Sequence, residues 1–255
     1  MTVHLIMLIL ALAQQWNSAG FPREAFNQPQ AESGQPPKRD LTGIWDSGPV
    51  GVQPTGHVTA PLTAYGQERL KNIKPGNGPR AVTEEFINDP LSINCDPSGF
   101  PRVVMYEMRP LQIVQTPNQI LILYQFGKTW RVIWTDGREL PKNPEPRWYG
   151  YSVGRWVDDY TLVVQSVGMD ERTWLDNAGN PHSENMRVEE RYHRAAHNTL
   201  ELSVTIDDPT TYTKPWVAYE KLPLRLMPAD TDLRENICSP TEAAAYKKLV
   251  DTQKK

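Results

Sequence analysis

Residues 187–204 read RVEERYHRAAHNTLELSV, and the alternation within them decides the fold of this 255-residue chain. Polar and apolar residues alternate through Arg187–Tyr192 and again through Leu200–Val204. Successive side chains of a β-strand point to opposite faces of a sheet. The pattern therefore predicts two strands, each with one polar and one apolar face, joined by a hairpin turn.

Further β-rich runs flank this hairpin, and several of them are separated by only a few turn residues. The expected strands cover Arg102–Glu107, Leu111–Gln115, Ile120–Phe126, Trp130–Thr135, Tyr149–Trp156, Thr161–Val167, Met186–Tyr192, Thr199–Ile206, Trp216–Leu226 and Leu233–Ile237. Helices are expected at Leu62–Ile73, with Thr63 as N-cap, and at Thr241–Val250. We therefore predict an all-β fold, an antiparallel meander that closes into a barrel or a strongly curved sandwich, with short peripheral helices.

The chain divides into three parts by composition. Residues 1–19 contain an apolar run followed by the small-x-small pattern Ala11-Leu12-Ala13, which predicts an export signal, although Lys and Arg are absent before the run. The run is too short to span a bilayer. Residues 20–40 are rich in Pro, Gln and Ser, which is typical of a flexible lead. Residues 41–255 are expected to form a single β domain in the periplasm or outside the cell.

Only two cysteines occur, Cys95 and Cys238. In an exported protein, a single pair of cysteines predicts a disulfide. The alternative is two unpaired buried thiols.

The first expected strand opens with Gly43-Ile44-Trp45. This Gly-x-Trp resembles the opening of lipocalin and other calycin barrels, which implies that Trp45 packs across the closed end. The same spacing recurs at Gly154-Arg155-Trp156, so at least one of the two matches is due to chance.

Longer motifs carry a second resemblance. They are Asp136–Pro141 (DGRELP), Trp148–Ser152 (WYGYS), Trp174–Glu184 (WLDNAGNPHSE), Thr205–Pro209 (TIDDP) and Tyr212–Trp216 (YTKPW). Together they resemble a large set of exported bacterial proteins of unassigned function, over roughly Leu41 to Cys238. The resemblance implies export and a calycin-like β fold, and it implies no reaction.

The stretch Gly168–Arg191 is the first candidate site, because polar and aromatic residues are concentrated in a long connection between two expected strands. We expect this connection to fold over the barrel mouth. The candidate acid–base residues are His182, Asp176, Asp170 and Glu184, and the candidate ligand contacts are Arg172 and Trp174. The alternative is a structural loop, in which Asn177–Pro181 forms a turn and Asp and Ser side chains cap their own backbone.

A second candidate cluster lies in the expected strand Trp130–Thr135. Trp134 and Arg131 are its candidate ligand contacts, and they point to opposite faces. An inward Arg131 needs a buried partner, for which Glu107 or Glu189 is expected. The alternative is an outward Arg131 on a half-solvated sheet.

A third cluster follows Asp207-Asp208-Pro209, where Tyr212, Lys214 and Trp216 are candidate ligand contacts. The alternative is an ordinary turn between strands. His193 and His197 have the spacing of two zinc ligands on a helix, but the segment is expected to be a hairpin turn, so no metal site is predicted.

Charge and motif content limit the partners. The formal net charge is −3 and no basic stripe occurs, so neither a nucleic acid nor an anionic membrane is an expected partner. No glycine pattern of a nucleotide fold occurs, and no cofactor is expected. The oligomeric state is left open.

These observations lead to two functional hypotheses. In both, an exported β-barrel takes a small, partly apolar molecule into an aromatic-lined pocket. Either the barrel performs metal-independent acid–base chemistry, or it is a non-catalytic carrier. His182 and an acid facing a pocket beside Arg131 or Arg172 favour the enzyme, and a purely aromatic and aliphatic lining favours the carrier.

Overall fold

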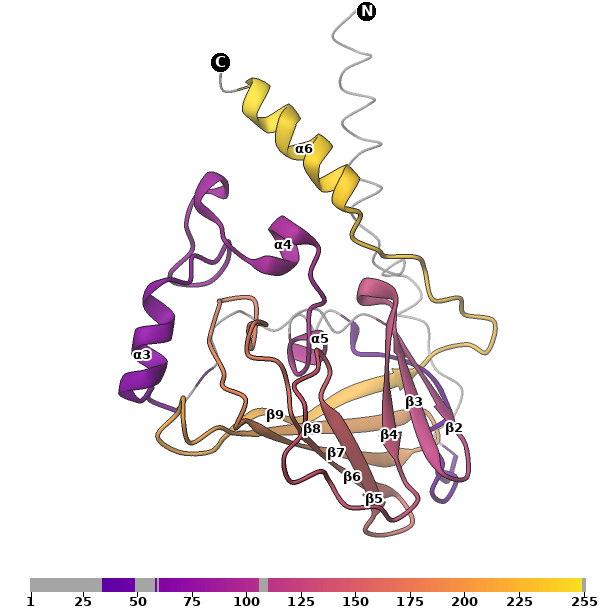
Figure 1. Ribbon diagram of the computed structural model, residues 1–255. Coiled ribbons are helices and arrows are strands. Elements are labelled where there is room, and N and C mark those ends of the chain that lie inside the picture. Colours follow the sequence, from indigo (N-terminus) through magenta and orange to yellow (C-terminus); the bar gives the residue numbers. More distant parts are fainter. Residues whose placement is uncertain (1–33, 49–57, 59, 106–109, 254–255) are drawn as a thin grey trace, which may run out of the picture. The chain divides into compact units, whose positions relative to one another are not determined.

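The computed structural model describes residues 34–48, 58, 60–105 and 110–253. The expected export signal and residues 20–33 of the expected lead lie outside this range. Within it, nine strands form a closed barrel in which each strand neighbours the next in the chain and the last neighbours the first (Figure 1). The strands are β1 (Gly43–Asp46), β2 (Leu111–Gln115), β3 (Gln119–Tyr124), β4 (Thr129–Trp134), β5 (Tyr151–Trp156), β6 (Thr161–Val167), β7 (Arg187–Ala196), β8 (Thr199–Asp207) and β9 (Trp216–Leu226).

Short helices occupy the connections. They are α3 (Ala64–Lys71), η2 (Glu84–Phe86), α4 (Pro90–Asn94), α5 (Arg102–Met105), η3 (Phe126–Lys128) and α6 (Pro240–Gln253). Thr63 caps α3 as predicted, and its hydroxyl accepts a hydrogen bond from the Gly66 amide. None of the helices in the described part of the chain is long and apolar enough to cross a membrane.

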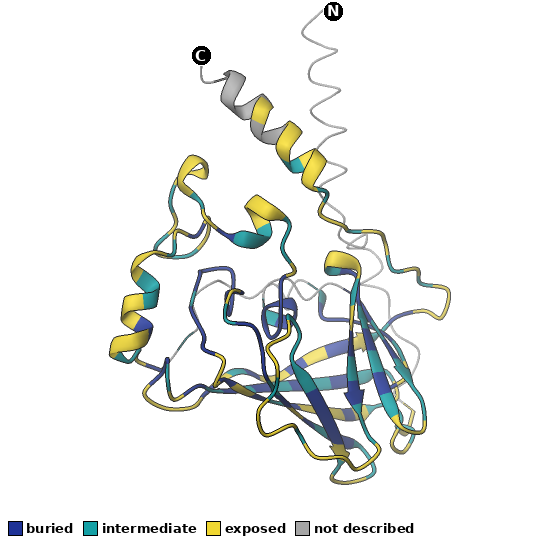
Figure 2. Cartoon of the chain, in the orientation of Figure 1, coloured by how far each residue is buried: buried dark blue, intermediate teal, exposed yellow. Residues whose placement is uncertain are grey.

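Alternation along the strands builds the core. In β7 and β8, every second residue is buried from Val188 to Arg194 and from Leu200 to Ile206, and Figure 2 shows this alternation along the strands. The predicted β fold is confirmed, and the closed barrel is the alternative that the structure adopts.

Two expected strands are wrong. Arg102–Met105 forms the helix α5, because the Val103 amide donates to the Gly99 carbonyl and the Val104 and Met105 amides donate to that of Pro101. The pair of β-branched residues suggested a strand, but both valines are buried, and tertiary packing overrides their local preference. Leu233–Ile237 forms no strand; the Arg234 amide donates to Gln125 Oε1, and the Leu233 carbonyl accepts from the Lys128 ammonium.

One pair of neighbouring strands departs from the expected antiparallel meander. Strands β4 and β5 run parallel and pair at only two positions, Ile133↔Ser152 and Trp134↔Val153. The connection 135–150 crosses back along the barrel without a helix, so β5 starts beside the end of β4. Thr129–Val132 at the start of β4 therefore has no strand partner on the β5 side among the described residues.

Trp45 is fully buried, as predicted. Its indole Nε1 donates to the Leu41 carbonyl at 2.9 Å, and the Arg194 guanidinium lies 5.0 Å from its ring centroid. Arg194 also donates to the carbonyls of Asp40 and His197, at 2.7 and 2.6 Å. These contacts connect the approach to β1 with the turn between β7 and β8.

The predicted disulfide is confirmed. Cys95 and Cys238 are bonded, with their Cα atoms 5.4 Å apart, so the bond joins the end of α4 to the residues that lead into α6. Disulfides of this kind are typical of oxidising compartments.

Candidate functional site

The connection between β6 and β7, residues 168–186, is called the central loop below. It is mostly buried, and residues 173–179 are all inaccessible to solvent or nearly so. Arg80 donates to the carbonyls of Ala178 and Gly179, and the buried Arg102 donates to Asn177 Oδ1. The loop is therefore an integral part of the fold.

The carboxylate of Asp176 is occupied by its own turn. Its Oδ1 accepts hydrogen bonds from the amides of Ala178 and Asn180, at 2.9 and 3.1 Å, and its Oδ2 accepts from the Asn180 side chain at 2.6 Å. This arrangement matches the turn that the sequence offered as the structural alternative.

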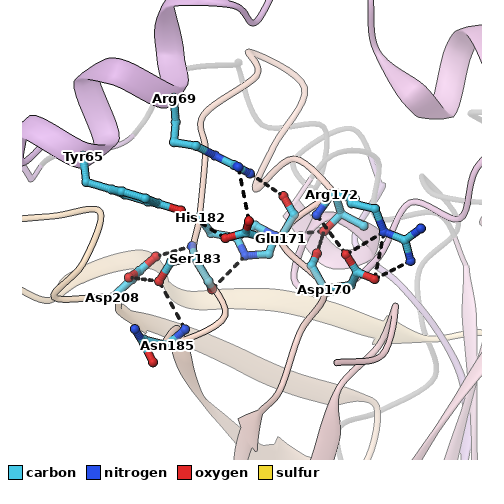
Figure 3. Close-up of polar contacts among 10 residues, drawn as sticks. Tyr65, Arg69, Asp170, Glu171, Arg172, His182, Ser183, Asn185 and Asp208 are labelled. Carbon is cyan, nitrogen blue, oxygen red and sulfur yellow. Dashed lines mark hydrogen bonds and ion pairs between the residues drawn. The ribbon is translucent and has the colours of Figure 1, made fainter. Parts of the chain in front are cut away.

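Asp170 is paired with Arg172, and Figure 3 shows the two-pronged contact. The hydrogen bonds from Arg172 hold the pKa of Asp170 below its usual value, against an opposing effect of burial. The Arg172 side chain itself is mostly exposed and lies over the Trp148 ring at 4.5 Å. Glu184, the fourth candidate acid, is exposed.

His182 is fully buried and held at both ring nitrogens. Nδ1 lies 3.2 Å from the Ser183 carbonyl, and Nε2 lies 2.8 Å from Thr173 Oγ1. A carbonyl only accepts, so Nδ1 donates, and the neutral ring then accepts from the Thr173 hydroxyl at Nε2. Burial lowers the pKa of His182, and the hydrogen bond to Ser183 only partly opposes this. The imidazole is therefore neutral at pH 7.

A small cavity lies outside this histidine. Its volume is about 300 Å3, and it is lined by Glu68, Arg69, Asn72, Ile73, Glu171, Arg172, Thr173, Trp174 and Pro181. We call it the loop cavity. Of the candidate residues in the central loop, Arg172 and Trp174 line it, while His182 is one hydrogen bond behind its wall, through Thr173. On the α3 side, Tyr65 and Arg69 both contact Glu171 (Figure 3).

The depressed pKa of His182 predicts a pH-dependent stability. Below about pH 6.5, His182 binds a proton in the unfolded chain and stays neutral in the native chain. The free energy of unfolding therefore falls as the pH falls. The slope is about 1.4 kcal/mol per pH unit for one proton. We expect His182→Asn, which keeps a donor toward the Ser183 carbonyl, to flatten this dependence between about pH 6.5 and about pH 5 in urea unfolding. His197→Asn is the matched control, because His197 is exposed and its described hydrogen bonds are made by its backbone; the loss of slope should be confined to His182→Asn. An unchanged slope in His182→Asn would contradict the assignment.

The third candidate cluster holds the central loop in place. Asp208 accepts from the amide and the hydroxyl of Ser183, both at 2.7 Å, and the Tyr212 hydroxyl donates to the Pro181 carbonyl at 2.8 Å. Tyr212 and Trp216 are buried and meet edge to face, whereas Lys214 is exposed. The described contacts of this cluster are those of a structural turn.

Arg131 faces the barrel interior, and its partner is Glu190. The expected partner Glu189 was wrong, because it lies on the outer face near Arg191; Glu107 lies outside the described residues. The alternation of side chains along β7 predicts Glu190 as the inward residue, because it shares its face with the buried Val188 and Tyr192. Burial alone would lower the pKa of Arg131, but Glu190 outweighs it and raises that pKa.

A larger cleft opens beside Arg131. Its volume is about 630 Å3, and it follows the gap between β4 and the approach to β5. It is lined by Lys128, Thr129, Trp130, Arg131, Val132, Trp134, Pro146, Arg147, Trp148, Tyr149, Gly150, Tyr151 and Ser152. We call it the seam cleft, because β4 and β5 pair at only two positions beside it.

The seam cleft unites two predicted residues with several that the sequence did not identify as contacts. Arg131 and Trp134 were expected to bind a ligand, whereas Trp130 was named only as the first residue of an expected strand and Trp148, Tyr149 and Tyr151 only within a motif. The signal was the density of aromatic residues in Trp148–Ser152. A parallel crossover brings this segment beside β4, and no local pattern predicts that crossover.

Gly150 shapes the inner wall of the seam cleft. Its φ is +62°, and a Cβ at this position would lie 2.6 Å from both the Met169 sulfur and the Val167 carbonyl oxygen. Glycine is the residue that meets both demands. It allows Tyr149 and Tyr151 to flank a tight bend.

His193 and His197, which have the spacing of two zinc ligands on a helix, do not lie on a helix. His193 lies in β7 and contacts the Thr161 hydroxyl at 3.0 Å, and His197 lies in the turn after β7. Across the described part of the chain, no group of three or more His, Cys, Asp or Glu side chains is arranged to hold a metal ion.

Comparison of the chain with protein-family models, with curated proteins and with solved structures finds no match. The function is therefore inferred from the contacts, charges and cavities described above.

Proposed function

We propose that this protein binds a small, partly apolar molecule in the seam cleft, as a calycin-like barrel with its ligand at the wall. One observation carries the proposal: five aromatic side chains, those of Trp130, Trp134, Trp148, Tyr149 and Tyr151, line a single cleft of about 630 Å3. This volume is within the range of about 300–1,000 Å3 that small-molecule sites occupy.

The aromatic side chains remain accessible. Trp130 is 56% exposed, and Trp134, Trp148, Tyr149 and Tyr151 are half-buried. Covering exposed aromatic surface with a ligand stabilises the complex through the hydrophobic effect. Each stacked pair of aromatic rings stabilises it by about 0.5–1.5 kcal/mol beyond the effect of the buried area. A planar apolar ligand is therefore the best match to this lining.

Binding without chemistry is the reading that the contacts favour. The Asp176 carboxylate accepts hydrogen bonds from its own turn, and the Asp170 carboxylate is paired with Arg172. Neither residue is part of the lining of the loop cavity. The acid–base role of His182, Asp176, Asp170 and Glu184 stays a prediction, and its strongest support is the hydrogen bond that links His182 to Thr173 in the cavity wall.

We also infer export to an oxidising compartment. The disulfide between Cys95 and Cys238 supports this inference, because such bonds persist where thiols are not kept reduced. The sequence motifs that resemble a set of exported bacterial proteins add to it.

A thermal-shift screen of planar aromatic molecules tests the proposed function. A ligand present at about 100 times its dissociation constant raises the free energy of unfolding by about 2.7 kcal/mol, which is measurable as an increase in melting temperature. We expect such hits with the wild type and a smaller shift with Trp130→Ala and Trp148→Ala.

Phe86→Ala is the matched control for Trp130→Ala. Phe86 is 57% exposed, close to the 56% of Trp130, and it lies in η2 and lines neither cavity. Its substitution should leave the ligand-induced shift intact. Equal loss in all three variants, or no hit with the wild type, would contradict the proposal.

A further inference from the structure

We propose that the ligand of the seam cleft is an anion, a planar apolar body that carries a carboxylate. This inference rests on the proposed function and specifies the polar group that the cleft selects. It is based on three features: the charge of the cleft lining, the unused donors on the barrel side of the cleft wall, and the cations already stacked on the rings of the lining.

The first feature is the charge of the lining. Lys128, Arg131 and Arg147 line the cleft, and none of the described lining residues is acidic. Glu190 neutralises Arg131 from the barrel side, so two cations remain without an acidic neighbour in the lining. A concave surface that carries one sign of charge attracts ligands of the opposite sign.

The second feature is a set of unused hydrogen-bond donors on the barrel side of the cleft wall. Arg131 is 3% exposed and uses Nη2 for Glu190, whereas its Nε and Nη1 have no partner among the described residues. The hydroxyl of Tyr124 on β3 is likewise buried, with no partner in the described part of the chain, and it lies within electrostatic range of Arg131. An unpaired buried donor destabilises the protein, so a site with several unused donors favours an occupant rich in acceptors.

These donors match anionic oxygens. Nη2 belongs to both two-pronged edges of the Arg131 guanidinium and is used by Glu190, so Nε and Nη1 can each donate one charge-assisted hydrogen bond to an anionic oxygen. The Phe100 ring covers one face of the Arg131 guanidinium at 3.9 Å, so further hydrogen bonds to Nε and Nη1 lie in the plane of the group. Water is the competing occupant, and the experiment below separates the two.

The third feature disfavours a cationic ligand. Three rings of the lining already carry a stacked guanidinium: Trp134 that of Arg138 at 3.6 Å, Tyr151 that of Arg147 at 4.1 Å, and Trp148 that of Arg172 at 4.5 Å. A cationic ligand would compete with these guanidinium groups for the same ring faces. Arg138 and Arg172 are already paired with Asp136 and Asp170, so Arg147 is the stacked cation that attracts an anion.

Isothermal titration of the full chain with three matched probes tests the inference. The probes are naphthoate, naphthamide and naphthylmethylamine, which share one planar body and differ in charge. We expect naphthoate to bind about tenfold more tightly than naphthamide, which corresponds to one charge-assisted hydrogen bond, and the amine to bind most weakly. Added salt should weaken the binding of naphthoate and not that of naphthamide.

Charge-removing variants locate the effect. Lys128→Gln and Arg147→Gln should weaken naphthoate and leave naphthamide unchanged, and Arg131→Lys, which keeps the charge beside Glu190, should reduce the preference for naphthoate further. Arg155→Gln is the matched control, because Arg155 is 54% exposed, pairs with Glu139 and lies outside the cleft lining. It should change neither affinity.

The outcomes separate this inference from the proposed function. Equal affinity for naphthoate and naphthamide, with both lost in Trp148→Ala, would overturn the anion and retain the binding cleft, with water on the unused donors. Naphthoate binding that survives Trp148→Ala, Lys128→Gln and Arg147→Gln would place the anion elsewhere and overturn the inference. Absence of binding by all three probes would overturn both.

Discussion

Arg131→Met is expected to lower the free energy of unfolding by about 3–5 kcal/mol, because it leaves the fully buried Glu190 without its charged partner. The Tyr192 hydroxyl still donates to Glu190 Oε1 at 2.8 Å, but one neutral donor does not replace a guanidinium. Chemical denaturation of the two purified chains measures the difference.

The double variant Arg131→Met with Glu190→Gln is the control for this prediction. It removes both charges while the amide oxygen of Gln continues to accept from Tyr192. We expect it to be more stable than the single variant, because the unpaired buried charge is gone. A single variant within about 0.5 kcal/mol of the wild type, or a double variant no more stable than the single, would contradict the buried pair.

Trp45→Ala is expected to destabilise the barrel by about 3–5 kcal/mol, as large-to-small substitutions in cores do. The substitution removes the ring that lies against Arg194 and leaves the Leu41 carbonyl without its indole donor. Trp156, in the second Gly-x-Trp match, is only half-buried, so Trp156→Ala should cost clearly less. An equal decrease in melting temperature in the two variants would refute the assignment of Trp45 as the buried residue at the closed end of the barrel.

The fold was predictable where side chains alternate. Strands such as β7 and β8 have one buried and one solvated face, and the alternation of polar and apolar residues in their sequences predicts this difference. The parallel pairing of β4 with β5 was not predictable, because it depends on how the connection 135–150 crosses the barrel. The same limit applies to α5, where packing decides the conformation of a β-branched pair.

The candidate site was predictable only in part. Arg131 and Trp134 were identified from one strand, and both line the seam cleft. The concentration of acids in the central loop was read as chemistry, yet Asp176 caps its own turn. Residue type and spacing do not reveal whether a carboxylate faces a cavity or its own backbone, since both arrangements use the same residues.

Fluorine NMR of the chain labelled with fluorotryptophan, titrated with naphthoate, tests most directly whether the seam cleft is the ligand site. The chain contains eight tryptophans, and each resonance can be assigned by replacing one Trp with Phe. Trp130, Trp134 and Trp148 line the seam cleft, Trp174 lines the loop cavity, and Trp45 is buried in the core. We expect saturable shifts for the three seam-cleft resonances and none for Trp174 or Trp45. Shifts confined to Trp174, or no shift at any seam-cleft tryptophan at saturating naphthoate, would contradict the account.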